Sequence, residues 1–267
     1  MKYWLNTFSG LGLVMMALVM IPLEPAKADL TWESTTTTVL KVGATVEKMG
    51  EIGQSYSLKY NVLRVDDLEQ TGARLLNFQN QMAVIFEFTS KTFILVTIPE
   101  LIAAAEDERA EVMKDLPNRE AQLKDLPAKE RAVLAGQLEA QKKKYELFNK
   151  PYTVSPTQEE SVIAGHPCLK YVGLAGGEAF QEIWVAKDLQ VDPAYKNYYA
   201  PGMAGQDRQE FCYLPLVPGF VMKVVSRFAG VTVTTEVTHL SNAVIPLDAF
   251  LIPPEFKPNP EVPWPGE

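Results

Sequence analysis

Apolar and polar residues alternate along several stretches of the chain, and this period of two predicts β-strands with one covered face. Two further stretches, Glu33–Val46 and Phe93–Ile98, are rich in β-favouring residues and also predict strands. We expect roughly eight to ten strands in all. The alternating positions are Tyr56, Leu58, Tyr60 and Val62, then Met82, Val84, Phe86 and Phe88, and finally Val231, Val233, Thr235 and Val237.

Two turns that contain glycine separate strand segments in the C-terminal half. Glycine supplies the positive φ that a tight hairpin needs, and such short connections join antiparallel strands. A last short strand is expected at Phe250–Pro253. The turns are Gly176-Gly177, between Ser161–Ala175 and Glu178–Ala186, and Ala229-Gly230, between Phe220–Phe228 and Val231–Leu240.

The segment Glu100–Phe148 is rich in Ala, Glu, Lys, Leu and Arg and holds no β-rich run, which predicts helices. Pro117 and Pro127 are expected to break it into two or three helices. Each of these prolines ends a Lys-Asp-Leu-Pro sequence. Because proline fits the first turn of a helix, we expect both copies to mark helix starts.

Together these elements predict one α+β domain: a curved antiparallel sheet, shaped as a half-barrel, with a helical insertion covering one face. No stretch of the sequence separates two cores. We expect the domain to span residues 29–256, with its helical insertion at 100–148 and a Pro-rich tail at 257–267.

The N-terminal residues have the pattern of a secretory signal peptide. Lys2 precedes a thirteen-residue apolar run, Leu11–Leu23, and a small-x-small sequence ends at Ala28. A retained membrane anchor is the alternative, but the run is short of the roughly 20 residues that a spanning helix needs. We therefore expect cleavage between Ala28 and Asp29, a periplasmic or secreted product, and no stable membrane span after cleavage.

The composition is that of an ordinary globular chain, with 47% hydrophobic and 22% charged residues. A net charge of −8 repels phosphate backbones, so we expect no nucleic-acid partner. No glycine-rich loop precedes a predicted helix, and no Gly-x-Ser-x-Gly or His-Glu-x-x-His sequence occurs. We expect no cofactor, no metal site and no enzymatic activity.

Cys168 and Cys212 are the only cysteines. Export exposes them to an oxidising compartment, where a bridge between them would stabilise the fold by about 3–4 kcal/mol. The alternative is two buried thiols that pack as small apolar side chains.

His166 and Cys168 lie two residues apart, so on a regular strand they share a face. A Cys–His nucleophile would need the imidazole to reach the sulfur and a third group to orient it. Neighbours on one strand project in parallel, which favours a structural role over catalysis or metal binding.

Several segments resemble the bacterial family known as domain of unknown function 4412. The resemblance covers about Glu100–Phe256, and Thr31–Pro99 follows it by pattern only. It implies an exported protein with a fold like that of the lipoprotein carriers LolA and LolB, a half-barrel with an apolar concave face. The similar segments are Leu126–Arg131 (LPAKER), Val162–Tyr171 (VIAGHPCLKY), Glu182–Asp188 (EIWVAKD), Pro218–Lys223 (PGFVMK), Thr235–Thr238 (TEVT) and Phe250–Pro253 (FLIP).

Large apolar side chains on the predicted strands are the candidate ligand-binding residues: Phe86, Phe88, Trp184 and Phe228. They would either pack beneath the helices or line a pocket left open where the sheet curves away. The expected function is a non-catalytic envelope protein that binds a lipid or other apolar ligand. The alternative is a structural module that contacts another envelope protein and takes no small ligand.

Overall fold

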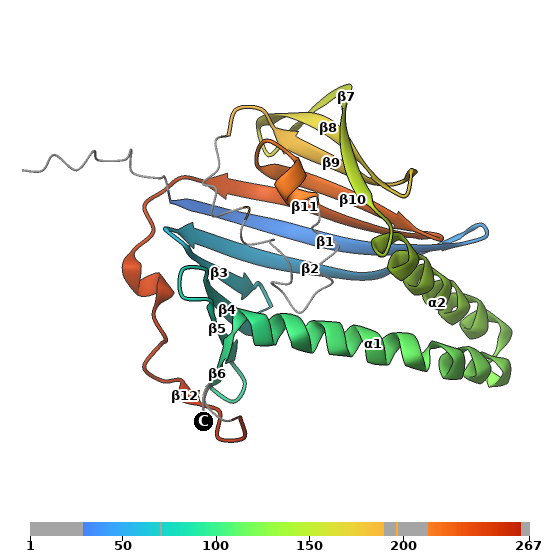
Figure 1. The fold of residues 1–267 in the computed structure, drawn as a ribbon, viewed down its shortest axis with the longest axis horizontal. Helices are drawn as coiled ribbons and strands as arrows, with labels where there is room; N and C mark the ends of the chain where they lie inside the picture. Colours follow the sequence, from blue (N-terminus) through green and yellow to red (C-terminus); the bar gives the residue numbers. More distant parts are fainter. Residues whose placement is uncertain (1–28, 70, 190–195, 197–212, 263–267) are drawn as a thin grey trace, which may run out of the picture.

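A curved, open β-sheet organises the fold (Figure 1). The computed structural model describes residues 29–69, 71–189, 196 and 213–262. Within these residues twelve strands form one sheet in the order β12-β6-β5-β4-β3-β2-β1-β11-β10-β9-β8-β7. Neighbouring strands are antiparallel except for the parallel pair β12 and β6. The predicted α+β fold with a curved antiparallel sheet is confirmed.

The chain builds one half of the sheet before the helices and the other half after them. The first strands are β1 (Leu30–Val42), β2 (Thr45–Lys59), β3 (Val62–Asp67), β4 (Gly72–Asn77), β5 (Met82–Glu87) and β6 (Thr92–Thr97). The helices are α1 (Ile98–Gln122), the short 3₁₀ helix η1 (Leu123–Asp125) and α2 (Ala128–Phe148). The later elements are β7 (Tyr152–Ile163), β8 (His166–Ala175), β9 (Glu178–Ala186), η2 (Leu214–Leu216), β10 (Val221–Phe228), β11 (Val231–Ser241), η3 (Leu247–Phe250) and β12 (Lys257–Pro258).

Both predicted glycine turns are confirmed, since Gly176, Gly177, Ala229 and Gly230 all have positive φ. A third hairpin corrects the expectation that Ser161–Ala175 is one strand. The chain turns at Ala164 (φ 46°) and Gly165 (φ 85°), and β7 and β8 pair on either side. Apolar residues flank this turn closely on both sides, so Gly165 was the one residue in the sequence that indicated a turn.

Helix α1 starts with a capping box. Thr97 Oγ1 accepts the Glu100 backbone N–H at 3.2 Å, and Glu100 Oε2 accepts the Thr97 N–H at 2.8 Å. The expected break at Pro117 is wrong, because α1 continues through it to Gln122. The Asp115 carboxylate accepts hydrogen bonds from Asn118 and Arg119 and so ties together the turn that contains the proline. Pro127 does mark the start of α2.

The two helices form a hairpin that meets the sheet at its ends and extends beyond it (Figure 1). Leu101 and Ile102, at the start of α1, pack on the main core. Near the middle of α2, a Cβ on Gly136 would lie 3.3 Å from side chains of Leu40 and Val42 of β1, so this face of the sheet, called here the inner face, is in close contact with the helix.

Aromatic rings fill the inner face near the start of β1. Trp32 stacks on Tyr56 with ring centroids 4.7 Å apart, and Phe220 meets Trp32 edge-on at 5.4 Å. All three side chains are less than a tenth exposed. Offset and edge-on ring pairs of this kind stabilise a core beyond the area they bury.

Residues 242–258, called here the C-terminal strap, cross the strand ends from β2 to β6 (Figure 1). Ile245 bonds to Lys59 at the end of β2, and the Ala249 carbonyl accepts from Arg64 of β3. The strap ends as β12, which pairs with β6. The strand expected at Phe250–Pro253 is therefore wrong: η3 occupies 247–250, and the pairing segment lies within the Pro-rich tail. The sequence does not reveal this pairing for two reasons. Prolines lack the backbone N–H that a strand donates, and the partner strand β6 lies far away in sequence.

Candidate functional site

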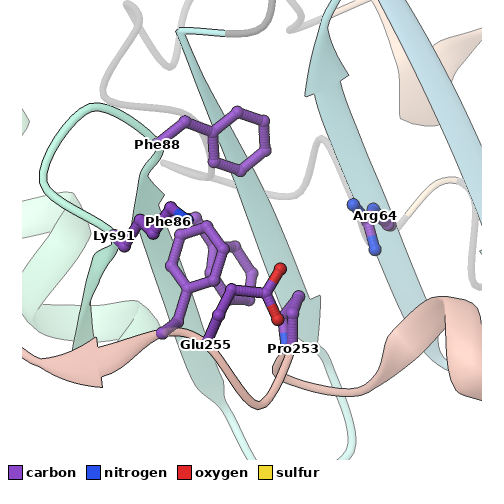
Figure 2. A pocket seen from close by; sticks show the side chains of 7 residues that line it. Arg64, Phe86, Phe88, Lys91, Pro253 and Glu255 are labelled. Atoms are coloured by element: carbon purple, nitrogen blue, oxygen red, sulfur yellow. The ribbon is translucent and has the colours of Figure 1, made fainter.

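A cavity of about 330 Å³ lies between the C-terminal strap and the outer face of the sheet, the face opposite α2 (Figure 2). This volume is at the lower end of the range for small-molecule sites. The cavity, called here the outer pocket, is lined by Arg64, Phe86, Phe88, Lys91, Pro253, Glu255 and Phe256.

Phenylalanine rings from two distant segments make the apolar wall of the outer pocket. Phe86 on β5 is 4% exposed and sits between Ala73 of β4 and Phe93 of β6 in the strand pairing. Phe256 of the strap meets the ring of Phe86 edge-on at 5.3 Å and that of Phe88 at 5.6 Å. The rings hold the strap on the sheet and leave aromatic surface facing the cavity.

Arg64 bounds one end of the outer pocket, and each of its three guanidinium nitrogens already donates a hydrogen bond. Its guanidinium donates to both carboxylate oxygens of Asp66 at 2.7–2.9 Å and to the Ala249 carbonyl at 2.7 Å. The Asp66 carboxylate offsets its charge. Arg64 thus fixes the strap and adds little net charge to the cavity.

Lys91 and Glu255 supply the other charges of the outer pocket. Lys91 sits in the β5–β6 turn with φ 51°, and its carbonyl accepts the Lys257 N–H at 3.0 Å, so β12 holds the turn in place. Within the described part of the chain, neither Lys91 nor Glu255 forms an ion pair. Figure 2 shows Lys91 and Arg64 toward opposite ends, with the Glu255 carboxylate between them in this view.

A second cavity, of about 310 Å³, lies at the ends of β3, β4 and β5. Its lining is more polar and includes Gln54, Asp67, Arg74 and Glu87. It has no aromatic wall other than Phe86, which makes it the weaker candidate for an apolar ligand.

The four sequence-predicted ligand residues do not share one face of the sheet. Phe86 and Phe88 lie together in the outer pocket. Trp184 lies opposite Lys170 and Lys223 in the strand pairing, on the outer face of the other half of the sheet. Phe228 is on the inner face, where it packs edge-on against Phe148 of α2 at 5.9 Å. The alternation of Met82, Val84, Phe86 and Phe88 brought the two phenylalanines together, but a local period could not relate the faces of distant strands.

In the structure the side chains of His166 and Cys168 do not bond to each other and have different partners. His166 Nδ1 lies 3.1 Å from Asp188 Oδ2, whereas the Cys168 thiol donates to the His166 backbone carbonyl at 3.3 Å. Cys168 is fully buried, and this burial raises the pKa of its thiol to about 11. Cys212 lies outside the described residues, so the Cys168–Cys212 bridge stays a prediction.

The predicted cleavage site falls where the described chain starts. Ala28 lies outside the described residues, and Asp29 is the first residue within them. The Asp29 carboxylate accepts hydrogen bonds from Lys59 Nζ and from the Ile245 N–H, each at 2.7 Å. Asp29 therefore fastens the start of β1 to the strap.

Sequence reasoning missed the five pocket residues other than Phe86 and Phe88. Lys91 belongs to a turn, Arg64 to a strand, and the rest to a Pro-rich segment. One signal was available: Phe256 is a large apolar residue among prolines, and such a residue needs a surface to cover it. The missed residues are Arg64, Lys91, Pro253, Glu255 and Phe256.

Neither helix of the described chain is long and apolar enough to cross a lipid bilayer. Among the same residues, no three His, Cys, Asp or Glu side chains are grouped closely enough to hold a metal ion.

Fold and site together define a class: an open antiparallel sheet with an inserted helical hairpin and an aromatic pocket under a C-terminal strap. The chain belongs to the family described as "Domain of unknown function (DUF4412)", which matches residues 100–256, more than half of the chain. That match contains α2 and β7–β11 and supplies the strap side of the outer pocket, while Phe86, Phe88 and Lys91 precede it. No match was found among curated proteins.

Two solved structures show a distant likeness. One is the crystal structure of MucB in complex with MucA(peri), with 12% identity over 84% of this chain and 55% of that one, and a TM-score of 0.30. The other is the complex of MucA and MucB from Pseudomonas aeruginosa, with 12% identity over 85% and 56% and the same TM-score. This chain spans little more than half the length of either.

Proposed function

We propose that this chain is an exported, non-catalytic binding protein of the bacterial envelope that holds a small ligand with an apolar body in the outer pocket. The observation that carries the proposal is the cavity itself: the rings of Phe86 on β5, Phe88 just after β5 and Phe256 of the strap line about 330 Å³ of open space. A ligand there would bury aromatic surface that now faces water.

Binding in the outer pocket is favoured over binding on the concave face of the half-barrel, which the family resemblance implies. Trp32, Tyr56 and Phe220 pack on one another on the inner face and are almost fully buried. A ligand entering there would have to displace packed rings, whereas the outer pocket is already open.

The N-terminal sequence supports export. A charged start, the apolar run Leu11–Leu23 and the small residues before Asp29 follow the order of a signal peptide. Cleavage after Ala28 would leave intact the bonds from the Asp29 side chain to Lys59 and Ile245.

The absence of catalysis is proposed from the chemistry of Cys168 and His166. A thiolate is the reactive form of cysteine, and a buried thiol with a pKa of about 11 is almost entirely protonated near neutral pH. His166 lies against Asp188 and does not bond to the sulfur.

The test is binding of the neutral fluorescent probe N-phenylnaphthylamine to residues 29–267. We expect saturable fluorescence enhancement that falls about tenfold in affinity in Phe88→Ala, because that change removes one of the three rings. Leu216→Ala removes an exposed apolar side chain that does not line the pocket, and it should bind like the parent. Equal binding by both variants, or none by the parent, would contradict the proposal.

A second candidate function, docking of another envelope protein, is favoured by the exposed face of the strap. Val244, Leu247 and Leu251 are 85%, 65% and 62% exposed within eight residues of sequence. Clustered exposed apolar residues are typical of interaction sites. Crosslinking in the native envelope, compared between the parent and Leu247→Asp, tests it: a crosslinked partner should appear only with the parent.

A further inference from the structure

The charges of the outer pocket point to a class of ligand, and this inference rests on the function proposed above. We infer that the outer pocket takes a small zwitterion with an apolar body, such as a free apolar amino acid or a short apolar peptide. Its body would lie on the phenylalanine rings, its carboxylate near Lys91 and its ammonium near Glu255.

Arg64 does not provide the anion site. Three of its hydrogen bonds go to the Asp66 carboxylate and one to the Ala249 carbonyl. Arg64 retains two N–H groups, but the Asp66 carboxylate paired with it already offsets its charge, so it offers a ligand carboxylate little net attraction. The available cation is therefore Lys91, which has no ion-pair partner among the described residues.

Glu255 is the available anion of the same cavity. In the strap it lies between two other residues that line the cavity, Pro253 and Phe256, and it is likewise unpaired among the residues described. No ion pair within 4.0 Å joins Lys91 and Glu255, so each presents its own charge to the same aromatic cavity.

Two separated charges of opposite sign select against ligands that carry only one. A ligand with only a carboxylate would be attracted by Lys91 but repelled by Glu255. A ligand with only an ammonium group would be attracted by Glu255 but repelled by Lys91. A zwitterion satisfies both charges and leaves the pocket neutral overall. The cavity of about 330 Å³ suits a molecule of amino-acid or dipeptide size.

Calorimetry with matched ligands tests the inference on residues 29–267. Phenylalanine carries both charges, phenethylamine lacks the carboxylate and hydrocinnamate lacks the amine, while all three share one ring. We expect phenylalanine to bind about tenfold more tightly than either analogue. Phenylalanylleucine forms a second arm, and tighter binding of the dipeptide would identify peptides as the source.

Two charge variants assign the ends of the ligand. Lys91→Met should reduce binding of phenylalanine to that of phenethylamine, and Glu255→Gln should reduce it to that of hydrocinnamate. Analogues that bind as tightly as phenylalanine, or variants that do not change the preference, would overturn the inference.

The neutral probe separates this outcome from failure of the proposed function. If N-phenylnaphthylamine binds and depends on Phe88 but no zwitterion preference appears, only the ligand class is wrong. If neither the probe nor phenylalanine binds the folded parent chain, the outer pocket is not a ligand site and both proposals fall.

Discussion

Asp29 and Lys59 form an ion pair of 2.7 Å that joins the start of β1 to the end of β2. The two side chains are only 12% and 10% exposed, and both also bond to the backbone of Ile245 in the strap. Because the pair is shielded from water and each charge has a second partner, it can contribute more than an exposed ion pair does.

Replacement of Asp29 by Asn should lower the free energy of unfolding by about 1–3 kcal/mol at pH 7, since it leaves the charge of Lys59 without its partner. Burial alone would raise the pKa of Asp29, but the hydrogen bonds from Lys59 and Ile245 and the charge of Lys59 outweigh it and hold the pKa below its usual value. The contribution is therefore present above the unfolded pKa of about 3.9 and is lost as pH falls through the lower, folded value. Urea unfolding at pH 7 and below pH 3 measures this difference.

Glu51→Gln is the control for that experiment. Glu51 pairs with Lys48 on β2, where both side chains are more than half exposed. The change should leave the free energy of unfolding nearly unchanged at either pH. Equal losses in the two variants would show that the shielded position of Asp29 adds nothing.

Pro117 should cost the protein stability, because it removes a backbone donor inside a helix and crowds the preceding turn. Pro117→Ala should raise the free energy of unfolding by about 1–3 kcal/mol. Pro99, in the first turn of the same helix, is the control: its missing N–H has no partner to lose there, so Pro99→Ala should change stability little. Chemical denaturation of the two variants is sufficient, and a destabilised Pro117→Ala protein would contradict the argument.

Local signals predicted much of the sheet, because period-two alternation and glycine turns act over only a few residues. Gly176-Gly177 and Ala229-Gly230 are such cases, and both turns were found. The predicted break at Pro117 was wrong because hydrogen bonds from Asn118 and Arg119 to Asp115 support the helix around the proline. The presence of a proline does not by itself show whether such bonds form.

The candidate site depends on long-range contacts, and this is why only part of it could be predicted from the sequence. Phe86 and Phe88 stood out by their alternation, but Phe256 reaches them through a strap that crosses from β2 to β6. Likewise, Trp184 and Phe228 have the same local pattern and still lie on opposite faces. The register of pairing across many strands decides which face of the sheet a side chain occupies, and this register cannot be read from the sequence of a single strand.

Cys168 should resist thiol reagents while the protein is folded and reduced. With its pKa raised to about 11, about one thiol in a thousand is ionised at pH 8, and the side chain has no exposed surface. Iodoacetamide followed by peptide mass spectrometry should find Cys168 unmodified in the folded chain and modified in urea. The same measurement without reductant tests the predicted bridge to Cys212, which would protect Cys168 in urea as well.

Gly230 should be intolerant of any side chain, for two reasons that can be separated. Its φ is +90°, and a Cβ there would lie 2.8 Å from the carbonyl oxygen of Lys41 on β1. Gly177 shares the positive φ (+86°) but has open space around the added atom, and Gly50 has neither feature. Gly230→Ala should therefore lower the free energy of unfolding the most, by about 2–4 kcal/mol, since strain and crowding add.

The two control glycines divide that loss into its parts. Gly177→Ala should cost about 1 kcal/mol from backbone strain alone, and Gly50→Ala should be neutral or slightly stabilising. Urea unfolding of all three variants gives the crowding contribution as the difference between Gly230→Ala and Gly177→Ala. If these two variants were equally stable, the close approach of the β10–β11 turn to Lys41 would not restrict the side chain at position 230.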